Sequence, residues 1–529
     1  MKKLLSLALS LFLLLSMVPA MAEDVPTFVI TLKTHTLVTD YEDNYLTKWI
    51  EENYGCNLEF NLLPAGEEGA SKLNMMVIGE EDLGDIIIWE SGLGAAATMS
   101  YADAGAILPM NEYIEKLDTN LEAMSDLLNV DFVAASKMPD GSIYSYPIYS
   151  PGPYNVTQYR AWINTTWLEN LDLEMPTTPD ELYNVLKAFK EQDANGNGDP
   201  NDEIPMLGCK AFSSYPQVFL LNGFVYYDRS PALTLDDGKV NAAYVQEGYR
   251  AGLSYINKLV EEGLIAKDSW TITSGQYKEY LATEIPTVGV HLYTNLAYMG
   301  PTDENKNQYE WLRPLIGADG EQRVPNIYAS GSPAQTLYIP ASAKDPEASF
   351  KLIDWLFTNE AFERARYGVE GIHYEKVTDA ETLKMMNLEE VGYAITEGPN
   401  GWGEANNMSW QIGLGNNMGY VVQNQWNGDP NYYQYKRQTA TQEMLKMMPQ
   451  AGEYVPALVY TTEEQEAYNE LSNTITTFYR EYEDRFILGD LDVDDDAVWQ
   501  AYLDTLYNEM GMEDYLKIIQ TAYDRTYAK

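Results

Sequence analysis

The stretch Thr27-Phe-Val-Ile-Thr-Leu-Lys33 begins the segment that decides the fold of this chain. It is an apolar run of strand length, and two more follow it, Asn57–Leu63 (NLEFNLL) and Asp85–Trp89 (DIIIW). Between the three runs, Glu42–Asn53 and Glu68–Ile78 have apolar residues at helical spacing. Strands that alternate with helices predict an α/β fold, in which a parallel sheet is covered by helices.

A second α/β segment follows a stiff aromatic connector, Tyr149–Tyr154 (YSPGPY), where we expect the chain to cross between lobes. Tyr159–Asn164 is a strand pattern. The helix after it has a full start signal, with Thr178 as N-cap, Pro179 as first helical residue and Glu181 completing a capping box. The last 70 or so residues are mostly helical in pattern, which predicts an added C-terminal helical region.

The 529-residue length exceeds what one hydrophobic core organises and predicts two or three lobes. The N-terminus is typical of a secretory signal, because Lys2 and Lys3 precede the apolar run Leu4–Val18 and a small-residue cleavage site, Ala20-Met-Ala22. We therefore expect residues 1–22 to be removed and the protein to be exported, to the cell surface, the extracellular space or the periplasm. No Cys stands at the cleavage point, so we expect no lipid anchor there.

The formal net charge of −46 argues against nucleic acid and anionic membranes as partners, since both would repel the chain. The only cysteines are Cys56 and Cys209, for which an exported chain permits a disulfide. We expect two unpaired, buried thiols instead. His35, His291 and His373 are scattered, which argues against a zinc site or a His-based catalytic centre.

The loop Asp193-Ala-Asn-Gly-Asn-Gly-Asp-Pro-Asn-Asp-Glu203 has oxygen-bearing side chains at alternate positions before a glycine. Ca²⁺ prefers six to eight oxygen ligands, and this spacing lets one tight turn direct several oxygens to a common point. It is not an EF-hand, because position twelve is Ile204 rather than Glu. The alternative is an acidic turn without metal. The expected ligands are Asp193, Asn195, Asn197, the carbonyl of Asp199, Asp202 and Glu203.

Several further segments, taken in order, resemble one known family. They include the segments LNMM at 73–76, PDGSIY at 139–144, PTTPDELY at 176–183, GVEGIHY at 368–374 and RFILG at 485–489. With the cation loop, they resemble the extracellular solute-binding proteins of bacterial ABC transporters, in the oligosaccharide-binding group that includes alginate-oligosaccharide and LipO-type binders.

That resemblance implies a two-lobed, type II periplasmic-binding-protein-like fold, in which two hinge-linked lobes close over an oligosaccharide and present it to a membrane permease. It also implies that the loop binds Ca²⁺ structurally, away from the sugar. The lobe limits that we expect are residues 23–155 with about 325–375 for the first lobe, and about 156–324 with 376–529 for the second. We expect a monomer.

Sugars present C–H groups on their faces and hydroxyls at their rims, so aromatic rings and polar side chains suit them. The chain has 41 Tyr and 11 Trp. The ring candidates could equally be core residues, although Trp402 and Trp410 lie in a polar, glycine-rich stretch. The candidates are Trp89, Tyr154, Trp270, Trp402 and Trp410 for stacking, with Arg160 and Asn406 for hydroxyl or carboxylate contacts.

Two other functions stay open on the sequence. A secreted carbohydrate-active enzyme would need two carboxylates about 5–9.5 Å apart, and 80 acidic residues do not exclude such a pair. No nucleophile elbow or phosphate loop favours catalysis. The third function is a binder of peptides, or a binder that serves a sensor.

Overall fold

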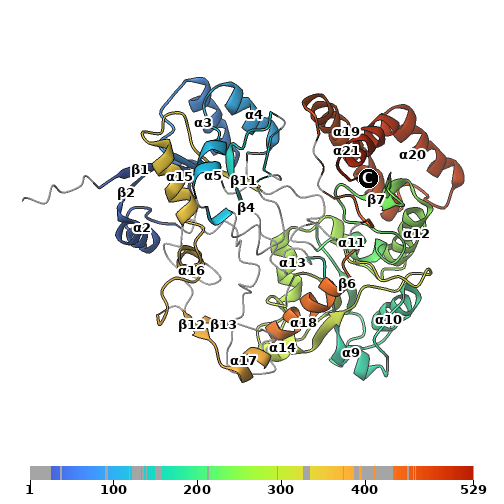
Figure 1. Ribbon diagram of the computed structural model, residues 1–529. Helices are drawn as coiled ribbons and strands as arrows, with labels where there is room; N and C mark the ends of the chain where they lie inside the picture. Colours follow the sequence, from blue (N-terminus) through green and yellow to red (C-terminus); the bar gives the residue numbers. More distant parts are fainter. Residues whose placement is uncertain are drawn as a thin grey trace, which may run out of the picture.

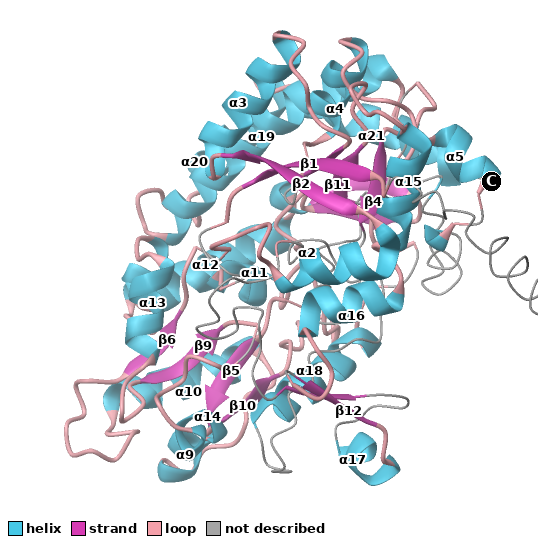
Figure 2. Ribbon diagram, turned by 90° about the vertical axis from the view of Figure 1, so that its left-hand side faces the viewer, coloured by secondary structure: helices cyan, strands magenta, loops and turns pink. Residues whose placement is uncertain are grey.

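The computed structural model contains two α/β lobes, each built on its own sheet (Figure 1). The residues that it describes are 25–35, 38–89, 93–117, 119–121, 133, 136–138, 140–148, 158–210, 214–294, 296–325, 334–372, 374–385, 392–395, 410, 433–449, 452–456, 458 and 460–527. The predicted signal, residues 1–22, lies outside them. The two sheets lie apart, at opposite ends of the molecule in Figure 2.

The first sheet has five strands in the order β2-β1-β3-β11-β4. The strands β2 and β3 pair with β1 in parallel, as the opening segment predicts. By contrast, β11 runs antiparallel to both β3 and β4, so the sheet is mixed. The strands are β1 (Thr27–Lys33), β2 (Asn57–Leu63), β3 (Ile86–Ile88), β4 (Ser145–Ile148) and β11 (Ala334–Tyr338).

Helices cover this sheet, and local sequence sets where several of them begin. Asn44 caps α2 by accepting from the N–H of Leu46, and Asp345 caps α15 by accepting from Ala348, as its position before Pro346 predicts. The helices are α2 (Tyr45–Ile50) with a π-turn (Glu51–Gly55), α3 (Gly66–Ile78), α4 (Ala95–Asp103), α5 (Asn111–Lys116), α15 (Pro346–Trp355) and α16 (Asn359–Tyr367).

The second sheet has the order β10-β5-β9-β6. Here β6 and β9 are parallel, whereas β5 runs antiparallel to β9 and β10. The carboxyl ends of β6 and β9 therefore share one edge of the sheet with the start of β5. The strands are β5 (Ala161–Asn164), β6 (Ile204–Leu207), β9 (Val288–Leu292) and β10 (Tyr309–Leu312).

The helix α10 (Pro179–Glu191) begins as predicted, with Thr178 accepting from the N–H of Glu181. The capping box is not formed, because the Glu181 carboxylate accepts from the main chain and hydroxyl of Thr177 instead. The other helices of this part are α9 (Thr165–Asn170), α11 (Pro216–Leu221), α12 (Glu247–Glu261), α13 (Ser274–Leu281) and α14 (Asp303–Asn307).

The C-terminal helices pack on the second lobe, where α19 contacts α12 and α21 lies against the hairpin of β7 (Leu233–Asp236) and β8 (Lys239–Ala242) (Figure 1). Asp495 caps α20 by accepting from the N–H groups of Ala497 and Val498. These helices are α18 (Tyr433–Lys446), α19 (Thr462–Ile487), α20 (Asp496–Asn508) and α21 (Met512–Tyr527).

Among the described residues, the chain passes from one lobe to the other three times. It crosses first between β4 and β5 and returns between β10 and β11. The third crossing follows Trp410, which packs in the first lobe although the predicted limits place it in the second, and precedes Tyr433, which packs in the second lobe. A small hairpin of β12 (Tyr374–Val377) and β13 (Gly392–Ile395), with α17 (Ala380–Met385), forms a separate sheet.

The two cysteines are free and buried, as predicted. Burial raises the pKa of the Cys56 thiol to about 12, which keeps it protonated and unreactive. Within the described residues, no helix is both long enough and apolar enough to cross a membrane.

Candidate functional site

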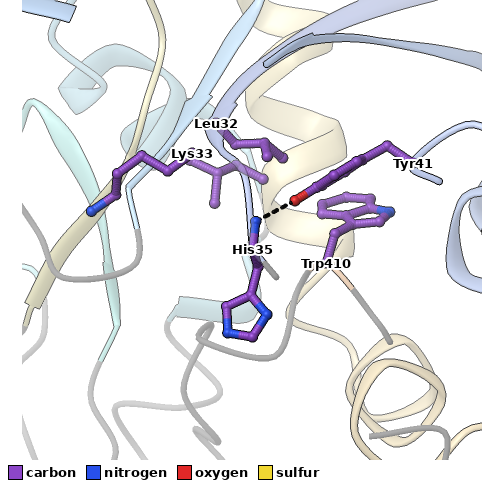
Figure 3. A pocket seen from close by; sticks show the side chains of 6 residues that line it. Leu32, Lys33, His35, Tyr41 and Trp410 are labelled. Atoms are coloured by element: carbon purple, nitrogen blue, oxygen red, sulfur yellow. Dashed lines mark hydrogen bonds between the residues drawn. The ribbon is translucent and has the colours of Figure 1, made fainter. Parts of the chain in front are cut away.

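The carboxyl edge of the first sheet carries a small pocket (Figure 3). Its volume is about 10 Å³, which is room for a single water molecule. The main-chain N–H of His35 donates to the hydroxyl of Tyr41 at 2.8 Å. In Figure 3 the side chain of Lys33 extends away from Trp410. The lining residues are Leu32, Lys33, His35, Tyr41, Ile88 and Trp410.

Three predicted stacking residues are buried in this structure: Trp89, Trp270 and Trp410 are 3%, 6% and 3% exposed. The indole N–H of Trp410 donates to Thr47 Oγ1 at 2.9 Å, and its ring packs edge-on against Phe60. Lys33 Nζ lies 4.4 Å from the centroid of a Trp89 ring. None of the three presents an open ring face here, so each contributes to the packing of its lobe.

Arg160, the predicted hydroxyl or carboxylate contact, is fully buried. Its guanidinium donates to the carbonyl of Thr294 and to Thr441 Oγ1, both at 2.7 Å. These bonds join the start of β5 to the segment after β9 and to α18, so Arg160 ties together the edge of the second sheet. The remaining ligand candidates, Tyr154, Trp402 and Asn406, lie outside the described residues.

Sequence reasoning missed a basic and aromatic group at the edge of the second sheet. It consists of Tyr159, Tyr215, Arg229 and Arg480, which come from four separate segments. No motif marks it, because its members are brought together only by the packing of α19 on the lobe. No basic run surrounds any of the four residues in the sequence, so nothing in it indicated a cationic patch.

A larger pocket, of about 490 Å³, is lined by α16 and β12 rather than by the strand ends of either sheet. Its volume suits a small ligand. Its charges already pair with one another, since Lys376 lies 2.7 Å from Glu363 and 3.9 Å from Glu370. It is therefore the weaker candidate for ligand capture.

The predicted cation loop connects α10 to β6. Gly198 N–H donates to Asp193 Oδ2 at 2.9 Å, Asn197 N–H to Asn195 Oδ1 at 2.9 Å, and Asp199 N–H to Asn197 Oδ1 at 2.7 Å. Gly198 has a φ of 90°, a conformation that favours glycine. The tight turn that the sequence predicts is therefore present.

The oxygens of this loop fit a cation in part. Asp193 Oδ1 and Glu203 Oε2 are buried without any hydrogen-bond partner, and burial raises the pKa of Glu203. Unpaired buried carboxylate oxygens are unfavourable, and a bound cation would satisfy them. The carboxylate of Asp202 instead accepts from the Nδ2 atoms of Asn195 and Asn197, at 3.0 and 2.7 Å.

The loop is not gathered around one point in this conformation. In the part of the chain that the structure describes, no three His, Cys, Asp or Glu side chains form a metal-binding group. Turning the amides of Asn195 and Asn197 by 180° would exchange their NH₂ groups for oxygens and turn two donors into ligands. The same rotation would break the bonds from the N–H groups of Asn197 and Asp199 to these amide oxygens, so cation binding by the amides would replace part of the present hydrogen bonding of the turn.

The family profile of the bacterial extracellular solute-binding proteins matches residues 36–361, which is more than half of the chain. The chain belongs to this family. The chain is similar to the fructooligosaccharide ABC transporter substrate-binding protein FusA of Streptococcus pneumoniae. The two are 26% identical over 501 residues, which cover 92% of this chain and 88% of FusA.

Solved structures share the fold of this solute-binding protein. One is FusA in complex with kestose, with a TM-score of 0.73 and 23% identity over 95% of this chain and 99% of FusA. Another is an HMO-binding, ABC-transporter-associated solute-binding protein from Bifidobacterium longum infantis, with a TM-score of 0.75 and 22% identity over 96% and 100% of the two chains.

Two further structures bear on the cation loop. One is an EF-hand mutant of FusA, with a TM-score of 0.73 and 23% identity over 95% of this chain and 99% of FusA. The other is the alginate-binding protein AlgQ2 without calcium ion, with a TM-score of 0.65 and 22% identity over 95% and 99% of the two chains. At this identity both show the fold of the chain alone.

Proposed function

We propose that this protein is the ligand-capturing component of an ABC transporter for oligosaccharides. The observation that carries the proposal is the architecture: two sheets on separate lobes, joined by three crossings of the chain. A ligand that contacts both lobes binds the closed state better and so increases its population. Family membership and the named ligands of FusA and the other relatives support an oligosaccharide as that ligand.

The cation loop has a structural part in this proposal, with Ca²⁺ as its ion. The loop precedes Ile204, the first residue of β6, and therefore lies at the end of that strand opposite its carboxyl edge. An ion held by Asp193, Asp202 and Glu203 would brace α10 against β6 without touching a sugar at the other edge. Ca²⁺ suits an all-oxygen loop of this kind.

The location, oligomeric state and protein partner follow from the same proposal. It is exported after removal of residues 1–22, acts as a monomer and delivers its ligand to the permease subunits of the transporter. The family and the signal pattern support export. Tyr154, Trp402 and Asn406 stay candidates for ligand contacts, and the edge residue Lys33 joins them.

A thermal-shift and calorimetry screen with neutral and acidic oligosaccharides, and with peptides, tests this proposal. A ligand at 100 times its Kd should stabilise the protein by about 2.7 kcal/mol. Small-angle scattering should show a smaller radius of gyration with the ligand bound. A response to peptides alone would overturn the proposal.

Product analysis after long incubation separates binding from hydrolysis. A solute-binding protein leaves every oligosaccharide intact. Shortened products that appear in proportion to protein concentration would favour the carbohydrate-active enzyme.

A further inference from the structure

Asn-Gly pairs are the sequences at which asparagine loses its amide nitrogen most readily, because glycine has no side chain to shield the main-chain nitrogen that attacks. The chain has five such pairs. Three of them, at Asn195, Asn197 and Asn222, lie in the described residues, and those at Asn400 and Asn427 lie outside them. The surroundings of the three described pairs differ, so their reactivities should differ as well.

The pair at Asn222 is held against reaction. Asn222 is 2% exposed, and its Nδ2 donates to the carbonyls of Val218 and Tyr227, both at 2.7 Å. The N–H of Gly223 donates to the carbonyl of Leu220 at 3.0 Å. The buried amide cannot turn toward the next nitrogen without losing these bonds. Asn222 is therefore an unreactive reference within the same lobe.

The pair at Asn197, in the cation loop, is the open one. Asn197 and Gly198 are exposed, and a Cβ added at Gly198 would meet no atom within 4 Å. By contrast, Asn195 is half-buried, and a Cβ at Gly196 would lie 3.7 Å from Asn170 Nδ2. Water, which the reaction consumes, therefore reaches Asn197 more freely than Asn195.

Two carboxylates contact the two nitrogens that would react at this pair. The attacking nitrogen, that of Gly198, donates its hydrogen to Asp193 Oδ2 at 2.9 Å. The leaving nitrogen, Asn197 Nδ2, donates to Asp202 Oδ2 at 2.7 Å. A carboxylate within hydrogen-bond reach of a proton can accept it while the new bond to carbon forms. The turn thus supplies a proton acceptor as well as an open Asn-Gly pair.

We propose that Asn197 is a site of spontaneous deamidation, with Asp193 as the proton acceptor. The Gly198 nitrogen bonds to Asn197 Cγ and gives its proton to Asp193, while the Cγ–Nδ2 bond breaks. Asp193 returns that proton to the leaving nitrogen, which departs as ammonia. Water then opens the five-membered succinimide ring at one of its two carbonyls and leaves aspartate or isoaspartate.

The product changes what the loop requires. A carboxylate at position 197 replaces the amide that now donates to Asp202, so two like charges meet in place of a hydrogen bond. A divalent cation between them would offset this repulsion. Deamidation should therefore make the loop depend more strongly on a cation. This consequence rests on the proposed Ca²⁺ site, whereas the deamidation itself does not.

Peptide mass spectrometry of the full chain, aged at neutral pH in EDTA, tests the modification. Deamidation appears as the mass gained when NH₂ is replaced by OH, and fragmentation separates Asn195 from Asn197 and aspartate from isoaspartate. We expect Asn197 to convert at least about tenfold faster than Asn222, because only Asn197 has both an open pair and a carboxylate on the attacking nitrogen.

Variants assign the chemistry to individual residues. Asp193→Asn keeps an oxygen for the Gly198 N–H but removes the proton acceptor, and should slow conversion of Asn197 about tenfold or more. Asn197→Gln would have to close a larger ring and should give almost no product at this position. Asp199→Asn removes the same charge from the same loop without touching either reacting nitrogen, so it is the matched control and should leave the rate unchanged.

The variant Asn197→Asp is a stable copy of one product and tests the consequence. It should lower Tm by about 2 °C or more in EDTA and be restored by Ca²⁺. Asn469→Asp adds the same charge at an exposed position of α19 and should change Tm little in either condition.

The outcomes separate the parts of this inference. If Asn197 converts no faster than Asn222, the modification site is overturned. If Asp193→Asn converts as fast as the wild type, Asp193 is not the proton acceptor. An equal loss of Tm in Asn197→Asp with and without Ca²⁺ overturns the cation dependence. None of these results would decide whether the protein captures oligosaccharides, which the ligand screen tests separately.

Discussion

The two lobes bury carboxylates in different ways. In the first lobe, Asp85 is 2% exposed and accepts from the main-chain N–H groups of Val29 at 2.9 Å and Lys344 at 2.8 Å. In the second lobe, Glu483 is 3% exposed and accepts from side chains only. The hydroxyls of Tyr227 and Tyr249 bind its Oε2 atom, at 2.6 and 2.8 Å.

This difference shows how far the burial of each carboxylate depends on the identity of the neighbouring side chains. Main-chain N–H groups are present whatever the neighbouring side chains are, so Asp85 ties strands together by backbone alone. Glu483 needs partners of particular identity in α11, in α12 and in the segment between them. The C-terminal helix α19 is therefore an integral part of the second lobe. That lobe also contains the cation loop and the buried Asp228, so we expect it to respond more strongly to pH and to cations.

Of the substitutions that test this difference, Glu483→Ala should lower the free energy of unfolding most. It leaves Tyr227, Tyr249 and Gln217 without their acceptor in a buried site. Buried donors without partners cost about 1–3 kcal/mol each, so we expect a loss of about 3 kcal/mol or more in the free energy of unfolding. Urea unfolding followed by intrinsic fluorescence measures it.

Two controls sharpen this result. Glu483→Gln keeps an acceptor oxygen and should cost less than the alanine variant. Glu481→Ala removes an exposed glutamate from the same helix, where the side chain is 65% exposed, and should change stability little. If Glu483→Ala cost no more than Glu481→Ala, the network around Glu483 would not hold α19 on the lobe.

Calcium should have the next largest effect, and only on the second lobe. At 100 times its Kd, Ca²⁺ should stabilise the protein by about 2.7 kcal/mol, and EDTA should remove that stabilisation. Asp193→Ala should lower Tm in Ca²⁺ and leave the EDTA-treated protein nearly unchanged. An equal fall in Tm under both conditions would show that Asp193 acts in the turn without a metal.

The features of the two lobes that could be predicted from the sequence are those set by residues close together in the chain. The β1 to β3 strands, and the caps at Thr178 and Asp345, follow from residues within a few positions of one another. The cation turn was predictable for the same reason, because all its oxygens lie between Asp193 and Glu203.

What the sequence did not predict depends on residues far apart in the chain. Trp410 is buried and packs against Phe60 across 350 positions, which its polar surroundings in the sequence did not indicate. The group of Arg229 and Arg480 exists only after α19 has docked. The antiparallel strand β11 returns from the second lobe, and no local periodicity distinguishes its direction from that of a parallel strand.

A smaller effect should come from the pH dependence of the second lobe. Burial raises the pKa of Asp228 from an ordinary 3.8 to about 7. The folded state thus holds this proton more tightly than the unfolded chain, so the contribution of Asp228 to stability is full below pH 3.8 and is lost as the pH rises to about 7. Asp228→Asn removes that ionisation and keeps an oxygen for the N–H of Ala232, which donates to Asp228 at 2.8 Å.

We therefore expect Asp228→Asn to be more stable than the wild type at pH 8, by at least about 1.4 kcal/mol, and nearly equal to it at pH 4. Tyr159 and Tyr479, whose pKa values are raised by burial and also by the Asp228 charge, are unchanged in the variant. Asp236→Asn, an exposed aspartate on β7, is the control. A difference between variant and wild type that stayed constant from pH 4 to pH 8 would contradict a raised pKa.

The smallest effect tests whether Trp410 belongs to the core of the first lobe or to its ligand surface. Thr47 is 1% exposed; its hydroxyl accepts from Trp410 Nε1 at 2.9 Å and donates to the carbonyl of Tyr41 at 2.6 Å. Thr47→Val keeps the shape and removes both bonds, which should cost about 1 kcal/mol in the free energy of unfolding. Thr474→Val, exposed on α19, is the matched control.

If Trp410 is a core residue, Thr47→Val should lower the stability of the first lobe and leave oligosaccharide affinity unchanged. If the ring stacks on the sugar, loosening its indole should weaken affinity while the unfolding transition stays in place. Calorimetry and urea unfolding on the same samples distinguish the two results. The hydroxyl of Tyr41 also accepts from the main-chain N–H of His35. A core role for Trp410 would therefore fix the end of β1 that faces the pocket. The first lobe would then hold its ligand edge by packing, whereas the second lobe holds its own edge by hydrogen bonds from Arg160.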